Sequence, residues 1–169
     1  MVHLLVEQLK FTRSELERSL TGVTEEEAVQ RFLPMNCLSW IVGHLANQEQ
    51  RYWLGFQGAE LVVPELNDLV GFGKPASTPP LAEMWEAWRA ITAATEPFLN
   101  GLTGESMLNV PESITRSMNE SIGTLMSRVV FHFWFHIGEG QAIRQLQAVP
   151  NLEVFVGDIG GKAPFRLEG

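Results

Sequence analysis

The feature that most constrains the fold of this chain is a pair of histidines, His132 and His136, four residues apart in a strongly apolar stretch. In an α-helix, residues at this spacing differ by roughly 40° around the axis and by about 6 Å along it, so both imidazoles point the same way. The same helical face carries apolar or small residues, namely Leu125, Val129, Gly140 and Ile143. The stretch therefore predicts a helix that packs its histidine face against other helices.

Two interpretations of the histidine pair are open. A buried imidazole needs a hydrogen-bonding partner, and a pair of neutral core histidines bonded to other groups meets this need. Binding of both imidazoles to one divalent metal ion meets it as well. His44, in the earlier helical stretch SWIVGHLANQEQRYW, is the obvious third ligand. Three neutral histidines leave positions on zinc, nickel, iron or manganese open for water or substrate, which is typical of catalytic sites.

Polar residues lie beside the histidines on the same helical faces. Glu139, one turn beyond His136, is a candidate general base or an acceptor for a ligand imidazole, and a solvated carboxylate is the alternative. Gln48 and Arg51 share the face of His44. They are candidates to bind an anionic substrate, although an arginine at a helix end is commonly only solvated.

The hydrophobic period of the chain indicates an all-α fold. Four long helices are expected, over residues 2–20, 37–57, 81–100 and 118–149. Residues 58–80, between the second and third helices, are broken by prolines and glycines and are long enough to travel the length of a bundle, so we expect a crossover connection there. The glycine-rich tail should lie extended against the bundle, with at most a short strand pair.

Local signals predict where some of these helices begin and which side chains face water. Thr24 with Glu27, and Ser117 with Glu120, have the spacing of capping boxes. Asn36 is a candidate cap for the second long helix.

The exposure of three further side chains can be predicted. Glu15 is expected to point outward from the first long helix. Cys37 is expected to pack in the interior, and His3 is expected to be exposed.

Composition and charge limit the class of protein. With 169 residues, 45% hydrophobic and 19% charged, the chain is expected to form one domain over residues 1–169. The formal net charge of -8 argues against a nucleic-acid partner. Charges at Glu7 and Lys10 interrupt any signal-type apolar region, and no apolar run is long enough for a membrane span. The single cysteine excludes an internal disulfide, so we expect a cytoplasmic protein.

The far side of the histidine helix is also apolar. It carries Val130, Trp134 and Ile137, which adds to a stripe already wide enough for a bundle core. Either the other helices or a second subunit must cover it, and we expect a homodimer.

The histidine stretches carry a resemblance to a known family. SWIVGHLANQEQRYW followed by FHFWFHIGEGQAIRQL resembles the DinB-like superfamily of metal-dependent four-helix bundles over nearly the whole chain. The resemblance implies that His44, His132 and His136 bind one divalent metal ion and that the helices follow an up-down-down-up order, and many members are homodimers. Many members have Arg-Gly-Gln after the second histidine of the pair, whereas here residues 137–140 separate His136 from Gln141.

The resemblance also implies a class of function. The superfamily includes transferases and isomerases that use low-molecular-weight thiols, in which the metal ion lowers the pKa of a bound thiol or water. Zinc or nickel is the first expectation for the metal, and a small molecule is the expected substrate. A metal-dependent hydrolase and a non-catalytic, stress-related dimer that binds metal or a small ligand are the alternatives.

Overall fold

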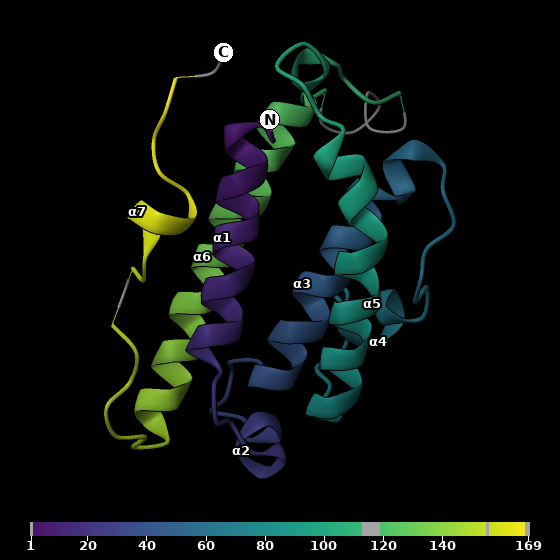
Figure 1. The fold of residues 1–169 in the computed structure, drawn as a ribbon. Coiled ribbons are helices and arrows are strands. Elements are labelled where there is room, and N and C mark those ends of the chain that lie inside the picture. The colour runs from purple at the N-terminus through teal and green to yellow at the C-terminus, as the bar shows by residue number, and fades with distance from the viewer. Residues whose placement is uncertain (1, 113–118, 155, 168–169) are drawn as a thin grey trace.

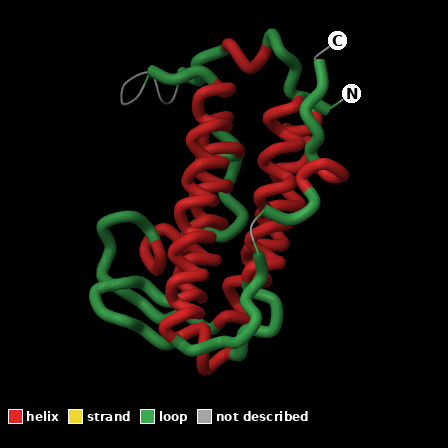
Figure 2. Tube along the Cα trace, turned by 90° about the vertical axis from the view of Figure 1, so that its left-hand side faces the viewer, coloured by secondary structure: helices red, strands yellow, loops and turns green. Residues whose placement is uncertain are grey.

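The structure is a computed structural model that describes residues 2–112, 119–154 and 156–167. All regular secondary structure in these ranges is helical, with no strand (Figures 1 and 2). The elements in chain order are α1 (Leu4–Ser19), α2 (Glu25–Val29), α3 (Leu38–Trp53), the 3-10 helix η1 (Gly55–Gln57), α4 (Leu66–Val70), α5 (Leu81–Asn100), the 3-10 helix η2 (Ser106–Leu108), α6 (Ile122–Leu146) and α7 (Ile159–Lys162). The all-α prediction is confirmed, and the described part of the tail has the short helix α7 in place of a strand pair.

The four long helices pack as two pairs. α3 lies along α5, with Gly43 beside Met84 near their starts and the rings of Trp53 and Phe98 6.2 Å apart near their ends. The two helices of this pair therefore run in the same direction, which requires the connection between them to return along the bundle (Figure 1). The long crossover predicted for residues 58–80 provides this return and contains the short helix α4.

The second pair is α1 with α6, and these helices also run in the same direction. The rings of Phe11 and Trp134 are 6.2 Å apart midway along the pair, and Arg144 donates to the backbone oxygen of Ser19 near its end. Val130 and Ile137 are buried in the same contact region. The apolar side that suggested a second subunit is thus covered by α1 of the same chain, so that reason for a dimer was wrong.

A buried ion pair joins the two helix pairs. Arg13 of α1 donates from Nε and Nη2 to the two carboxylate oxygens of Glu49 in α3, at 2.8 and 2.6 Å. The Glu49 side chain is 0% exposed, and Thr95 of α5 accepts a further hydrogen bond from Arg13 at 3.0 Å. The carboxylate and the guanidinium satisfy each other, which a buried charge requires.

Helix starts follow local signals in part. The capping box of Thr24 and Glu27 is confirmed. The N-cap of α3 is Cys37, not Asn36. α6 begins at Ile122 with Ser121 as its N-cap, later than expected, and Ser117 of the predicted second capping box lies outside the described residues.

Two side chains that were expected to be solvated have structural roles. Glu15 is buried, because its carboxylate accepts from Arg18 and from the backbone N–H of Gly157 in the tail. His3 is half-buried and is the N-cap of α1, where its ring accepts from the N–H of Leu5. Sequence reasoning missed both roles. Among the described helices, none is long and apolar enough to cross a membrane.

Candidate metal centre

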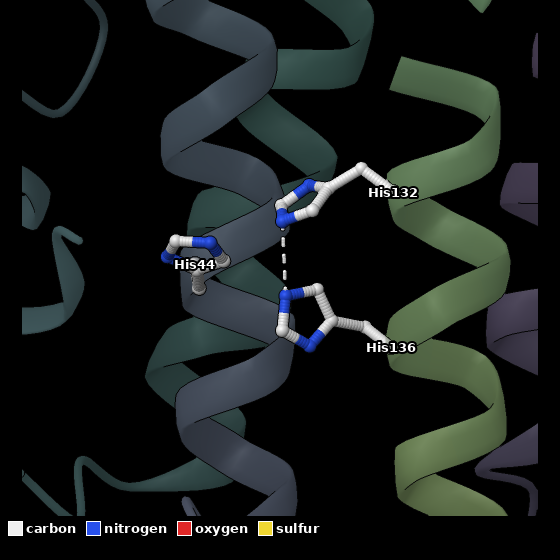
Figure 3. A group of neighbouring side chains, drawn as sticks. All are labelled: His44, His132 and His136. Carbon is white, nitrogen blue, oxygen red and sulfur yellow. Dashed lines mark hydrogen bonds between the residues drawn. The ribbon is translucent and has the colours of Figure 1, made fainter. Parts of the chain in front are cut away.

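Three histidines from two helices converge in the space between α3 and α6. His44 comes from α3, and His132 and His136 come from adjacent turns of α6 (Figure 3). One ring nitrogen from each residue lies within 4.8 Å of the others, and the two Nε2 atoms of the α6 pair are 3.0 Å apart. His44 and His136 are buried and His132 is half-buried. The structure therefore brings together the three residues that the sequence singled out.

Each imidazole is oriented by an acceptor at its Nδ1 atom. Nδ1 of His44 lies 2.8 Å from the backbone oxygen of Val70. Nδ1 of His132 lies 2.7 Å from Oε1 of Gln48, and Nδ1 of His136 lies 2.7 Å from Oε2 of Glu139. Carbonyl and carboxylate oxygens only accept hydrogen bonds, so each Nδ1 carries the proton and donates it. In the neutral imidazoles, each Nε2 atom then keeps a free lone pair.

This tautomer leaves the Nε2 atoms of His132 and His136 facing each other at 3.0 Å without a proton between them. Two lone pairs at this distance repel each other unless a positive charge lies nearby. Protonation of two of the rings is opposed, because burial lowers the pKa of His132 to about 3 and that of His44 to about 4. Three imidazole nitrogens that converge in this way fit a divalent metal ion. The cluster is thus compatible with a divalent metal site.

An aromatic wall restrains the cluster on one side. The ring of Trp40, one turn before His44 on α3, stacks on the His44 imidazole with a centroid distance of 4.4 Å and an interplanar angle of 11°. The same indole lies 6.2 Å from the ring of His136. Trp40 therefore limits rotation of the His44 ring and excludes water from that side of the cluster.

The polar residues predicted near the site occupy different positions. Gln48 and Glu139 both contact a histidine of the cluster, and both are half-buried. Arg51 is exposed, and its guanidinium lies 3.3 Å from Oδ1 of Asn67. Its positive charge helps to lower the pKa of His44, although burial is the larger cause. Arg51 therefore lies outside the contact shell of the imidazoles.

Val70 is a part of the site that sequence reasoning missed. Its backbone oxygen, at the end of α4 in the crossover, is the acceptor for His44. A backbone carbonyl has no signature in the sequence. A short apolar helix within the crossover was the only available signal, and it indicates that the segment packs on α3 rather than that it bonds to an imidazole.

Comparison with known proteins assigns the chain to a family. Residues 4–148, which cover α1 to α6, match the family described as Mycothiol-S-transferase. No curated protein matches the chain. The matched region contains all three histidines and the three acceptors at their Nδ1 atoms. The chain therefore belongs to the Mycothiol-S-transferase family, which is part of the DinB-like superfamily of metal-dependent proteins.

Proposed function

We propose that this protein is a metal-dependent transferase that joins a low-molecular-weight thiol, with mycothiol as the first candidate, to a small electrophilic molecule. The observation that carries the proposal is the convergence of three neutral histidines, each with its Nδ1 proton held by an acceptor, in a chain of this family. A reducing, cytoplasmic setting fits such a reaction, because small thiols and the free Cys37 stay reduced there.

We propose an up-down-down-up four-helix bundle of the DinB-like type as the fold, over a single domain. Two observations support this order: α1 with α6 and α3 with α5 form pairs that each run in one direction. The pairs run opposite to each other, because α3 and α6 approach with Leu38 near Gly140 at one level and Gln48 beside His132 at another. Facing side chains from such pairs can build a metal site in the bundle interior.

His44, His132 and His136 are the proposed ligands of the metal ion. Zinc and nickel are the leading candidates, because imidazole nitrogens suit both, and iron and manganese are alternatives. When bound, such an ion lowers the pKa of a coordinated thiol, so that the thiolate is available at neutral pH. The protein supplies three imidazoles that are oriented before the ion arrives, and a dry aromatic wall beside them.

In the proposed reaction, the thiol sulfur forms a bond to the electrophilic carbon, and the bond from that carbon to its leaving group breaks with its electron pair. The thiol proton must also leave. Glu139 is the carboxylate nearest to the cluster and is proposed to accept it, because its side chain is 20% exposed and can pass the proton to solvent. Gln48 and Arg51 are proposed to contact the substrate from α3, with Arg51 attracting an anionic group.

Metal content and thiol consumption together test this proposal. We expect protein purified without chelators or a metal-binding tag to contain about one equivalent of divalent metal, and we expect it to consume mycothiol only when an alkyl halide is present. His44→Ala, His132→Ala and His136→Ala should each lose most of the metal and the activity. His3→Asn is the control, because asparagine also caps a helix start.

Two results would contradict the proposal. Full metal content in His44→Ala would reduce the site to a pair on one helix. Turnover of esters or amides without any thiol would instead favour the metal-dependent hydrolase.

We also propose a homodimer, formed by the exposed face of α6. Phe131 and Phe135 are 71% and 68% exposed on this face. Gly138 and Ala142 continue the same face at helical spacing, and a Cβ atom added to Gly138 would meet nothing within 4 Å. If a second copy packs antiparallel about a two-fold axis, Phe135 lies opposite the partner's Gly138 and Phe131 lies opposite the partner's Ala142. Each phenylalanine then packs against a small residue of the other copy, and the two-fold axis repeats this packing on both halves of the interface.

A further inference from the structure

An apolar cavity lies at the end of the molecule where α3 and α5 end and α6 begins. Its volume is about 120 Å³. Its walls come from three long helices, from η1 and from the segment that follows η2. The lining residues are Tyr52, Trp53, Phe56, Gln57, Phe98, Asn109, Pro111, Ile122 and Leu125. No residue of the histidine cluster lines it, so it is separate from the candidate metal site.

The walls of the cavity suit an aromatic ring. The rings of Tyr52 and Phe56 have centroids 4.8 Å apart, and those of Trp53 and Phe98 are 6.2 Å apart. Four aromatic rings thus surround a space similar in volume to the engineered apolar cavity of roughly 150 Å³ that binds benzene. None of the described residues that line the cavity is charged, so these walls select against charged groups.

One polar atom of the wall residues lacks a partner. The indole Nε1 of Trp53 is buried and has no hydrogen-bond partner among the described residues. A buried donor left in this state costs roughly 1 to 3 kcal/mol. Because this atom has almost no accessible surface, a ligand in the cavity would not reach it, and the choice of ligand rests on the apolar walls.

The cavity is aligned with the histidine cluster along the helices. On α3, Tyr52 lies one turn beyond Gln48, which bonds to His132. On α6, Leu125 lies two turns before His132, which is roughly 10 Å along the axis. An aryl group in the cavity therefore lies about 10 Å from the histidines along the axis, so a substrate that joins the two places needs a spacer of roughly that length.

We propose that this cavity binds the apolar end of the electrophilic substrate, and that the preferred end is an uncharged, compact aryl group. The role of the cavity in the reaction rests on the proposed transferase function. The binding of an aromatic ring to the cavity does not depend on that function. Phe98 and Leu125 would contact the ring from opposite helices, and the aryl group would hold the electrophile in one orientation while its other end reacts with the thiol.

Benzene is the direct probe of the cavity. We expect benzene, added near its solubility limit to the metal-loaded protein, to raise the melting temperature by about 2 to 5 °C. Leu125→Phe should fill the space and abolish this shift, and Ile122→Phe, at a half-buried position, is a second filling variant in case the first folds poorly. Leu146→Phe makes the same change at an exposed position at the other end of α6 and should leave the shift intact.

The reaction provides the second arm of the test. With a 6-phenylhexyl halide and a hexyl halide as alternative electrophiles, Leu125→Phe should raise KM for the phenylhexyl halide about tenfold more than KM for the hexyl halide. The absence of a benzene shift in the unmodified protein, an equal shift in both filling variants, or an equal change in both KM values would overturn the cavity assignment. Benzene binding without any thiol transfer would contradict the transferase proposal alone and would leave the cavity assignment standing.

Discussion

The three histidines are distinguished from ordinary core histidines by the acceptors at their Nδ1 atoms. A core histidine uses both nitrogens to satisfy its neighbours, whereas here a backbone oxygen, an amide oxygen and a carboxylate oxygen hold the three Nδ1 protons. The Nε2 atoms point toward the centre of the cluster, and those of His132 and His136 are 3.0 Å apart. This arrangement is unfavourable for an empty pair of neutral rings and favourable for a shared cation.

Gln48 should therefore affect metal affinity more than folding. In Gln48→Leu, the Nδ1 proton of His132 loses its acceptor, and we expect the metal dissociation constant to rise roughly 10- to 100-fold. Competition with a chromogenic chelator measures the change. Gln145→Leu, at an exposed position of α6, is the matched control and should bind metal normally. Unchanged affinity in Gln48→Leu would assign Gln48 to the substrate alone.

The lowered pKa values of two histidines predict how the stability of the metal-free protein depends on pH. The unfolded chain binds protons at these imidazoles below about pH 6.5, whereas the folded chain keeps His44 neutral to about pH 4 and His132 to about pH 3. Their contribution to stability is thus present above about pH 6.5 and is lost as the pH falls toward 4 and then 3. We expect the free energy of unfolding to fall by at most about 4 kcal/mol between pH 7 and pH 5, at most about 2 kcal/mol from each group, and the half-buried His132 contributes less because solvent screens it.

Urea unfolding in the presence of a chelator at the two pH values tests this prediction. His132→Leu should show a shallower decline than the unmodified protein, because one of the two depressed pKa values is gone. His3→Asn should show the same decline as the unmodified protein. Parallel declines in the unmodified protein and in His132→Leu would contradict the assignment of the effect to this histidine.

Among the helices, α3 contributes to the candidate metal site with one face and to a buried ion pair with another. One face presents His44 and Gln48 to α6, and another presents Glu49 to Arg13 of α1. Gly43, next to His44, allows the close approach of α5, because a Cβ atom there would lie 2.3 Å from Sδ of Met84. The position of His44 thus depends on contacts that α3 makes with the helices on its other sides.

The buried ion pair on α3 should contribute strongly to stability when one partner is removed. In Glu49→Gln, the Arg13 guanidinium stays buried with only part of its charge compensated by Glu96, and we expect a loss of about 3 kcal/mol in the free energy of unfolding. Glu120→Gln breaks an exposed pair with Arg128 and should cost far less. Chemical denaturation of both variants gives the comparison. Equal losses would show that burial does not control the strength of these pairs.

In the molecule as a whole, the candidate metal site lies between two pairs of helices, and the helices within each pair run in the same direction. The histidines approach one another from α3 and α6, and the crossover adds the Val70 oxygen from a third side. The apolar cavity lies farther along the same helices, at the end where α6 begins. The candidate metal site and the apolar cavity thus lie at separate places along the same helices.

The exposed face of α6 predicts the oligomeric state. We expect sedimentation at micromolar concentration to show a dimer, and the double variant Phe131→Ser with Phe135→Ser to be monomeric, because it removes the large side chains of the proposed interface. Phe165→Ser, at another highly exposed phenylalanine, is the control and should stay dimeric. A dimer that survives the double variant would place the interface elsewhere.

Features that depend on neighbours within about four residues could be predicted from the sequence alone. The hydrophobic period predicted the long helices, the spacing of Thr24 and Glu27 predicted a capping box, and the spacing of His132 and His136 placed both rings on one face. His44 was chosen as the third ligand from its own helical stretch, and the resemblance to a family supported the choice, because no local rule connects α3 with α6. These predictions succeeded because helix geometry converts sequence spacing directly into spatial position.

Contacts between groups from distant segments depend on how the helices pack, and the sequence did not predict them. The Val70 oxygen lies 26 residues from His44, Glu49 lies 36 residues from Arg13, and Glu25 accepts from the first N–H of α5 across 56 residues. Glu15 was expected to face water, and a backbone N–H of the tail instead helps to bury it. Such contacts have no periodic signal, because their partners are fixed by the packing of whole helices, and a backbone oxygen is the same at every position of the sequence.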